Sequence, residues 1–254
     1  EHLAQTWLDR IEAPWHFMTK IPACLHRRLK MISPSKNPAY VLARQDVLSM
    51  VDESKPCTSL LDVGCSRGAT AALFRASRPE ISRAVGIELD QQAAQAAREA
   101  SFDEVHCEDA EQVLSRLATQ AERFDLILCG DVLEHLLDPW TALRHIRHLC
   151  TPHGQVIISL PNVAHYSTLV ALLARKWPYA SRGIHDRTHL RWFAERNLKD
   201  LYEQASFREV ERKKKHRLLE RPHKLNAKTE PFLANVPFVS GLTVFQFLSR
   251  LEPQ

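Results

Sequence analysis

The chain has 254 residues, of which 44% are hydrophobic and 25% charged, and its formal net charge is +4 at pH 7. These values are typical of a globular protein with a sizeable core, and they exclude an intrinsically disordered chain. The sequence offers no apolar run near the roughly 18 residues that span a bilayer and no signal-peptide pattern. The six cysteines form no CxxC pair and no disulfide framework, which favours a reducing, cytoplasmic setting.

The first elements along the chain are predicted to be helical. Residues 2–32 carry apolar and aromatic side chains at mixed spacing, and we expect residues 1–38 to form an N-terminal helical cap. The remaining domain, 39–254, begins with a helix whose apolar face includes Tyr40, Val47 and Val51.

Strands and helices then alternate. Short apolar runs occur near residues 58–63, 83–88, 103–107, 124–130 and 155–160. Helical patterns follow the first four runs, and the clearest of these helices is expected at 140–149. This alternation predicts an α/β domain with a doubly wound, mostly parallel sheet that is covered on both faces.

The C-terminal region departs from this alternation. Residues 207–215 and 242–249 are strand-like, and no helix is predicted between them. We therefore expect an antiparallel pair at one edge, which completes a seven-stranded sheet with an antiparallel last strand.

The stretch "SLLDVGCSRGAT", residues 59–70, joins the first predicted strand to a helix. Its glycines, Gly64 and Gly68, are four positions apart and lack the middle glycine of a diphosphate-binding G-x-G-x-x-G loop. An uncharged or cationic ligand fits this loop better, because Asp62 stands close enough to sense a positive group. Glu88 ends the second strand, where a carboxylate can accept hydrogen bonds from both hydroxyls of a ribose. Together these features predict a nucleoside ligand, although each acid alone is more typical of a turn or a helix cap.

In this order the segments resemble the motifs of class I S-adenosylmethionine-dependent methyltransferases, from "LLDVGCSRG" through "VGIELD" and "CEDAE" to "FDLILCGDVLEHLLDP". The resemblance implies a Rossmann-like methyltransferase fold with S-adenosylmethionine as the cofactor. It places Asp62 and the two glycines at the methionine end, Glu88 on the ribose, and Asp109 against the adenine. Ser66 replaces the usual central glycine. The full set of residues that the resemblance assigns to the cofactor is Asp62, Gly64, Cys65, Gly68, Glu88, Leu89, Asp109, Ala110 and Asp131.

The region after the fifth strand resembles the lid of bacterial small-molecule methyltransferases, including ones associated with polysaccharide synthesis. We expect this lid insertion at 163–193. The resemblance places His165 and His189 beside the transferred methyl group, where a histidine can act as the general base, and Asp131 is the third catalytic candidate. His165 could instead close the loop structurally, and His185 is expected to be structural.

The "DVLEH" sequence, read with His189, also resembles the metal site of small-RNA 2′-O-methyltransferases and the ExxEH motif of ubiquinone-pathway O-methyltransferases. Asp131, Glu134, His135 and His189 would then bind Mg or Mn. The alternative is that Asp131 caps a helix and Glu134 completes a capping box without any metal. A zinc hydrolase using His185 and His189 is a distant rival.

A basic run, "ERKKKHR" at 211–217, leaves two functions open. The favoured one is O-methylation of an anionic small-molecule, sugar or lipid-linked acceptor, with peripheral membrane contact through the apolar helix expected at 169–177. The alternative is a metal-assisted RNA 2′-O-methyltransferase that binds nucleic acid through this run. An edge strand protected by lysines would also explain the run.

Overall fold

The computed structural model describes residues 42–220, 223–235 and 239–254. The chain divides into two units, Glu1–Ser33 and Pro34–Gln254, and every described residue belongs to the second. The predicted N-terminal cap therefore lies outside the described residues. Of the helix predicted around Val47, the described part is the short α3, Gln45–Leu48.

A seven-stranded sheet forms the centre of the described domain, and its strand order is β3-β2-β1-β4-β5-β7-β6. The strands β1 to β5 run parallel, while β7 lies between β5 and β6 and is antiparallel to both. The predicted fold class is confirmed. The strand bounds are Ser59–Val63, Arg83–Ile87, Glu104–His106, Phe124–Gly130, Cys150–Pro161, Phe207–His216 and Val244–Pro253 for β1 to β7.

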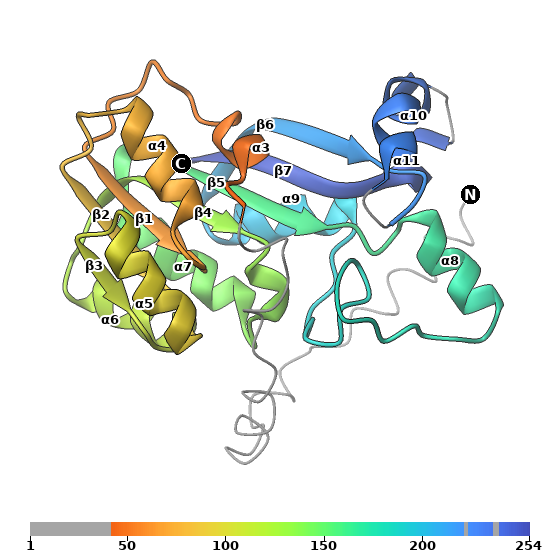
Figure 1. Ribbon diagram of the computed structural model, residues 1–254, viewed down its shortest axis with the longest axis horizontal. Helices are drawn as coiled ribbons and strands as arrows, with labels where there is room; N and C mark the ends of the chain where they lie inside the picture. Colours follow the sequence, from red (N-terminus) through yellow and green to blue (C-terminus); the bar gives the residue numbers. More distant parts are fainter. Residues whose placement is uncertain (1–41, 221–222, 236–238) are drawn as a thin grey trace, which may run out of the picture. The chain divides into compact units, whose positions relative to one another are not determined.

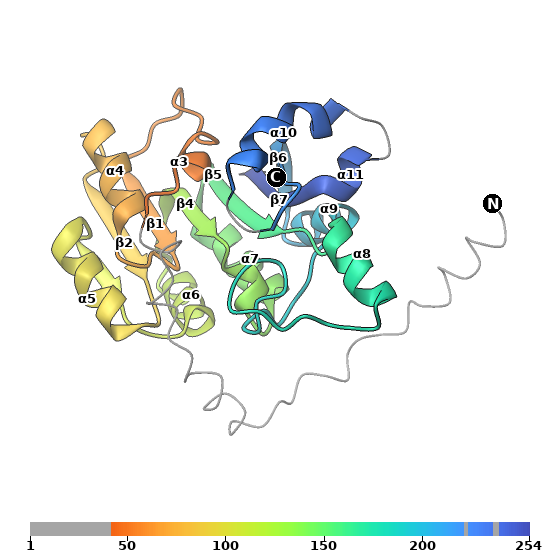
Figure 2. The same cartoon turned by 45° about the vertical axis from the view of Figure 1, so that its right-hand side comes forward.

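Helices cover both faces of this sheet (Figures 1 and 2). One face carries α3, α4 (Ala69–Ser77) and α5 (Gln91–Ala100), and the other carries α6 (Ala110–Thr119), α7 (Pro139–Leu149) and α9 (Glu195–Gln204). Two separate hydrophobic clusters result. Successive residues of the central strand β1 serve both, since Leu60 packs in one cluster and Leu61 in the other. Because both faces are buried, the strand reads as a continuous apolar run.

After β5 the chain leaves the sheet and returns at a defined point. Asn162 pairs with Phe193 in an isolated bridge, and the Val163 N–H donates to the Phe193 carbonyl at 2.9 Å. The segment predicted as a lid, 163–193, lies between these two residues. It contains α8, Tyr166–Leu173, followed by irregular chain.

Two helices lie between β6 and β7, where none was predicted. They are α10, Lys224–Asn235, and α11, Val239–Thr243. The sequence did not reveal α10 because it contains Pro231 and buries only Asn226 and Leu233, so it lacks an apolar stripe at helical spacing. The predicted antiparallel pairing of β6 with β7 is confirmed.

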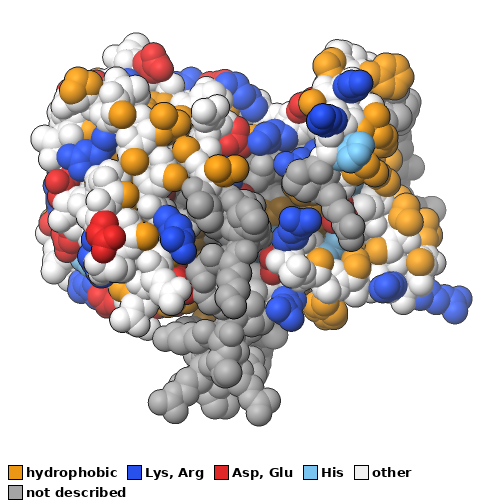
Figure 3. Space-filling model, in the orientation of Figure 1, with side chains coloured by type: hydrophobic (Ala, Val, Ile, Leu, Met, Phe, Trp, Pro, Cys, Tyr) orange, Lys and Arg blue, Asp and Glu red, His pale blue; other side chains and the backbone are white. Residues whose placement is uncertain are grey.

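The helix α8 exposes much of its apolar surface. Leu169, Val170, Leu172 and Leu173 are 49–76% exposed, and hydrophobic side chains gather where α8 and α10 lie, with basic ones beside them (Figure 3). Within the described ranges, no helix is long and apolar enough to cross a membrane.

Candidate functional site

The glycine-rich loop after β1 depends on left-handed backbone. Gly64 has φ +73°, and a Cβ atom there would lie 2.5 Å from a methyl of Val132. Gly68, with φ +81°, precedes the first residue of α4. Ser66 also has a positive φ, 50°, which glycine adopts at lower cost than serine. The loop therefore turns tightly at the carboxyl end of β1, where α/β sheets bind ligands.

Glu88 stands at the carboxyl end of the neighbouring β2 and is held by the backbone. Its two carboxylate oxygens accept hydrogen bonds from the N–H groups of Ser66, at 2.9 Å, and Asp90, at 2.8 Å. Burial raises the pKa of Glu88, although these N–H groups oppose the rise. Each oxygen keeps a further lone pair for a ligand hydroxyl. Glu88 is thus oriented beside the glycine-rich loop, as a ribose-binding carboxylate must be.

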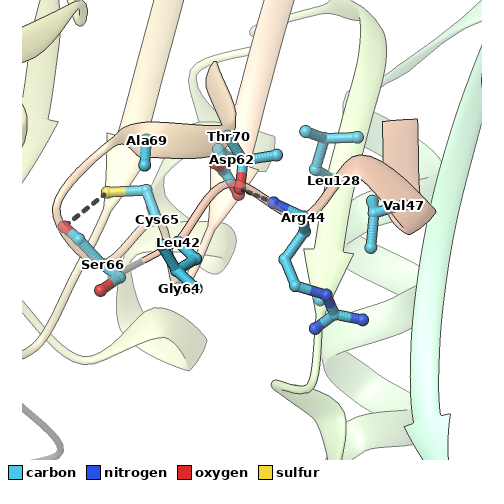
Figure 4. A pocket seen from close by; sticks show the side chains of 11 residues that line it. Leu42, Arg44, Val47, Asp62, Gly64, Cys65, Ser66, Ala69, Thr70 and Leu128 are labelled. Atoms are coloured by element: carbon cyan, nitrogen blue, oxygen red, sulfur yellow. Dashed lines mark hydrogen bonds between the residues drawn. The ribbon is translucent and has the colours of Figure 1, made fainter. Parts of the chain in front are cut away.

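Asp62 is buried at the floor of a small pocket that also includes Cys65, Ser66 and Thr70 (Figure 4). Its side chain is without a cationic partner among the described residues, and burial followed by the nearby Glu88 charge raises its pKa to about 7. A buried carboxylate without a cation is costly unless a positive ligand group approaches it. The pocket therefore suits a ligand with a cationic end.

The residues assigned to the adenine side follow the strands β2 and β3. Leu89 follows Glu88 and is 51% exposed, which leaves an apolar surface next to the Glu88 carboxylate. Asp109 is the N-cap of α6 and accepts from the Glu111 N–H at 3.0 Å, with Ala110 as the first helical residue. Cys65 is buried beside Gly86, and burial raises the pKa of its thiol.

Asp131 has a different environment from the one expected. Its carboxylate accepts hydrogen bonds from Arg44 at 2.7 Å, Ser159 at 2.7 Å and Gln246 at 2.6 Å. Burial alone would raise its pKa, but Arg44 and these hydrogen bonds lower it. The alternative of a capping box is wrong, because the following turn is a short 3-10 helix, η3 (Leu133–His135), whose N-cap is Val132.

Three of the four predicted metal ligands come together. The possible ligand atoms of Glu134, His135 and His189 lie within 4.8 Å of one another. Asp131 is not in this group. Its backbone is left-handed, with a φ of +56°, and its carboxylate is bound by Arg44. The lid supplies His189, and the Glu134 carbonyl accepts from the N–H groups of Leu190 and Arg191 at 2.8 and 3.0 Å.

The hydrogen bonds of this cluster leave the Nε2 atoms of both histidines and one Glu134 oxygen available to bind an ion. The Nδ1–H groups of His135 and His189 donate to the carbonyls of Thr188, at 3.2 Å, and Ile184, at 3.0 Å. Both Nε2 atoms can then carry lone pairs, and Glu134 Oε2 is buried without a partner in the described structure. Such outer hydrogen bonds to histidine are typical of metal ligands. The donor set of one carboxylate and two imidazoles therefore fits a divalent ion.

Burial dominates the pKa values in this cluster. It raises that of Glu134 well above its ordinary value, and it lowers those of His135 and His189, the latter to about 4. Burial thus favours the uncharged form of all three groups.

His165 and His185 are used within the protein. His165 is fully buried, its Nε2–H donates to the Arg217 carbonyl at 3.0 Å, and its Nδ1 lies 2.8 Å from the Ser167 hydroxyl at the start of α8. His185 Nε2 lies 3.1 Å from the Thr168 hydroxyl. Both histidines hold the segment 163–193 in place, and His185 is outside the three-residue cluster that contains His189.

Residues 211–216 of the basic run lie on the edge strand β6, where the lysines pair with carboxylates. Among its cations, Lys214 pairs with Glu195 at 2.6 Å and Lys215 with Asp46 at 2.7 Å, while Lys213 pairs with Glu211 at 3.6 Å. These ion pairs leave little free charge for an anionic partner on this strand.

Sequence reasoning missed Arg44 and Gln246, which hold Asp131 from opposite ends of the described domain. Neither lies in a motif, and only the fold brings residues 44, 131 and 246 together. The sequence signal for Arg44 was the short apolar pattern around Val47, which predicts a helix there. That pattern does not indicate that Arg44 binds Asp131.

Comparison with known proteins bears on this geometry. The methyltransferase domain family matches residues 20–212. A ubiquinone biosynthesis O-methyltransferase of Alkalilimnicola ehrlichii is 33% identical over 131 residues, covering 50% of this chain and 52% of that protein. One from Cereibacter sphaeroides is 29% identical over 163 residues, covering 61% and 62%. The chain thus spans between half and two thirds of the length of these curated relatives.

Solved structures are similar in fold at low sequence identity. A SAM-dependent methyltransferase from Archaeoglobus fulgidus is 17% identical, with a TM-score of 0.54 and coverage of 82% of this chain and 90% of that one. A Thermotoga maritima protein, described as a possible histamine N-methyltransferase, is 18% identical, with a TM-score of 0.55 and coverage of 91% and 96%. The sequence match and the fold agree, and this chain belongs to the methyltransferase domain family.

Proposed function

We propose that this protein is an S-adenosylmethionine-dependent methyltransferase that methylates a hydroxyl oxygen of a small-molecule or lipid-linked acceptor. The observation that carries the proposal is the placement of the Gly64–Gly68 loop beside Glu88, at the carboxyl ends of two neighbouring strands. The buried, unpaired Asp62 supports a cofactor with a cationic end. The names of the relatives support oxygen as the target atom.

Each part of the cofactor has residues suited to it. When bound, S-adenosylmethionine supplies an electrophilic methyl group on a sulfonium. Asp62 and the glycine-rich loop would hold its methionine end, Glu88 its ribose, and Leu89 with Asp109 and Ala110 its adenine. The lid, 163–193, would exclude water from the acceptor side.

Among the lid histidines, His189 is better suited than His165 to receive the acceptor proton. Both nitrogens of His165 are bonded within the protein, whereas His189 Nε2 is 4.0 Å from Glu134 Oε1 and is neutral near pH 7. Asp131 is a poor base, because Arg44, Ser159 and Gln246 hold it in its ionised form. We expect Asp131 to position groups in the site instead.

Calorimetric titration tests the cofactor assignment. The wild-type protein should bind S-adenosylmethionine and its demethylated product, and Glu88→Ala should weaken both by about ten- to a hundredfold, or ~1.5–3 kcal/mol, through loss of charge-assisted hydrogen bonds. Glu99→Ala, which removes an exposed carboxylate on α5, is the matched control and should change nothing. Binding of NAD in place of S-adenosylmethionine would contradict the assignment.

The cluster of Glu134, His135 and His189 supports a second role for His189, as a ligand of a metal ion. A bound Mg or Mn ion would lower the pKa of the acceptor hydroxyl, so that no strong base is needed. Thermal unfolding in Mn²⁺ tests this use without an acceptor. The wild type should gain stability in the ion, and Glu134→Gln should lose that gain. Asp131→Asn should keep it, since Asp131 lies outside the cluster. An unchanged melting temperature in Mn²⁺ would rule out the ion and leave His189 as the base.

The RNA alternative receives no support from the basic strand, since Lys213, Lys214 and Lys215 are already paired with carboxylates. Peripheral membrane contact is supported instead by the exposed apolar face of α8, which ends beside Arg175 and Lys176. Such a surface would suit a lipid-linked acceptor.

A further inference from the structure

Arg217 occupies a fixed position between the lid and the end of the sheet. It directly follows β6, its N–H donates to the Thr243 carbonyl at 2.9 Å, and its own carbonyl accepts from His165 Nε2 at 3.0 Å. The backbone of Arg217 is therefore held by the last residue of α11 on one side and by His165 on the other.

The guanidinium of Arg217 lacks an acidic partner in the described part of the chain. Its carbon lies 4.1 Å from the centre of the Phe245 ring, a stacking arrangement that fixes its plane. Its side-chain hydrogen bond goes to the backbone carbonyl of Glu220 at a long 3.3 Å. On the preceding strand β6, Arg208 and Arg212 each pair with a carboxylate, so Arg217 differs from these two arginines.

The acids around Arg217 are already engaged by other groups. Asp131 is bound by Arg44 and Asp46 by Lys215, each at 2.7 Å. Glu230 accepts from the His216 N–H at 3.2 Å. Burial lowers the pKa of Arg217, and the nearby Arg44 charge lowers it further, while Asp131 and Glu230 oppose this. A half-buried cation in this state is stabilised when an external anion completes its hydrogen bonds.

Arg217 also lies near the point where the chain leaves β5 at Asn162. The carbonyl of Phe245, on which it stacks, accepts from Asn162 N–H at 3.0 Å, where the lid begins. The next residue, Gln246, donates to Asp131 at 2.6 Å. The charges of Asp131 and Arg44 both act on Arg217, so an acceptor group held by Arg217 would lie close to the Asp131 network.

We propose that Arg217 binds an anionic group, a carboxylate or a phosphate, on the methyl acceptor. This rests on the proposed function, and it narrows the substrate to molecules that carry both a hydroxyl and a separate anion. The planar guanidinium can make two parallel hydrogen bonds to either anion, and Phe245 holds it in the required plane. Arg217 is accordingly a residue of substrate specificity rather than of cofactor binding.

Calorimetry with simple probes tests this proposal on the whole protein saturated with S-adenosylhomocysteine. Benzoate and phenyl phosphate supply the two anions, and benzyl alcohol is the neutral analogue. We expect the wild type to bind at least one anion more tightly than the alcohol. Arg217→Gln should weaken anion binding about tenfold or more, as expected for losing a charge-assisted hydrogen bond. Arg217→Lys should retain part of the affinity, and whichever probe binds more tightly identifies the anion.

Arg208→Gln is the matched control, because it removes the same charge from the exposed far end of β6. It should leave anion binding unchanged. Equal anion affinity in wild type and Arg217→Gln, or no anion binding by the wild type, would overturn the role of Arg217. Failure of the wild type to bind S-adenosylhomocysteine at all would instead contradict the proposed function, so the two failures are distinct.

Discussion

Three residues in five positions of the loop after β1 adopt left-handed backbone, with φ values of 73° at Gly64, 50° at Ser66 and 81° at Gly68. Glycine carries no steric cost in this region, whereas an ordinary residue loses roughly 1–2 kcal/mol. The two glycines were recognisable from the sequence as loop formers. The strained conformation of Ser66 was not, because it depends on Glu88 accepting the Ser66 N–H.

The loop geometry predicts opposite outcomes for two small substitutions. Gly64→Ala should lower the free energy of unfolding by about 1–3 kcal/mol, since its methyl would meet Val132 at 2.5 Å on top of the backbone cost. Ser66→Gly should be neutral or stabilising within about 1 kcal/mol, because it relieves the left-handed strain. Urea unfolding measures both. An unchanged midpoint for Gly64→Ala would show that the loop relaxes around the added carbon.

The buried Asp62 is expected to lower the stability of the cofactor-free protein at high pH, while its carboxylate favours binding of the cofactor. Its pKa is about 7 in the folded protein against an ordinary value of 3.8, so between these values the folded state keeps a proton that the unfolded chain loses. The free energy of unfolding contributed by Asp62 therefore falls as the pH rises from about 4 to about 7.

Asp62→Asn removes this effect. Without cofactor, the variant should melt at a higher temperature than wild type at pH 8, and the difference should vanish near pH 4. Its affinity for S-adenosylmethionine should be lower at pH 8, because the carboxylate that faces the cationic end is gone. A variant that melts below wild type at pH 8 would show that Asp62 is stabilised by its surroundings.

At the scale of elements, the sequence predicted the strands more closely than the turns. The strands β1, β2, β4 and β5 were visible because most of their residues are buried on both faces, and their side chains form short apolar runs. The turn after β4 was misjudged because Asp131 and Glu134 have the spacing of a capping box. Its actual form depends on Arg44 and Gln246, which are distant in sequence. Because Arg44 and Gln246 hold Asp131, only the other three of the four predicted metal ligands come together.

The lid depends on His165 as an anchor. Its ring is fully buried, bonds at both nitrogens and packs against Tyr166 and Phe245 with centroid distances of 4.5 and 5.9 Å. We expect His165→Ala to cost about 2–3 kcal/mol of stability by removing these bonds and leaving a cavity.

Hydrogen exchange provides the measurement for this anchor. Exchange in His165→Ala should accelerate mainly within 163–193, while calorimetric affinity for S-adenosylmethionine stays near that of wild type. If the variant loses cofactor affinity and the lid stays protected, His165 serves the cofactor site rather than the lid.

At the scale of the whole molecule, the net charge of +4 says little about binding partners. Which surfaces can bind an anion depends on which basic side chains lack an acidic partner. The lysines of β6 are paired, whereas the cations near the end of α8 stand beside exposed leucines. The sequence showed both groups of residues but not which of them would be neutralised. Pairing between Lys215 and Asp46, for example, joins residues 169 positions apart.

The exposed face of α8 predicts binding to membranes that contain anionic lipid. Leu173→Glu should reduce co-sedimentation with vesicles of phosphatidylcholine and phosphatidylglycerol, because Leu173 is 76% exposed and a new carboxylate opposes both apolar and electrostatic contact. Leu73→Glu on α4 introduces the same charge elsewhere and should have no effect. Equal sedimentation of Leu173→Glu and wild type would exclude α8 as the contact surface.

The strand β7 lies between β5 and β6 in the sheet but comes last in the chain. This position sets the order in which the two halves of the site can form during translation. When residues 42–243 have been synthesised, β5 and β6 each still have an open edge, since the strand that pairs with both is the last of the sheet to be made. That strand also brings Gln246 to Asp131 and Phe245 to Arg217. The nascent chain can therefore form the cofactor half of the site on the ribosome, but the acceptor half only after β7 has emerged.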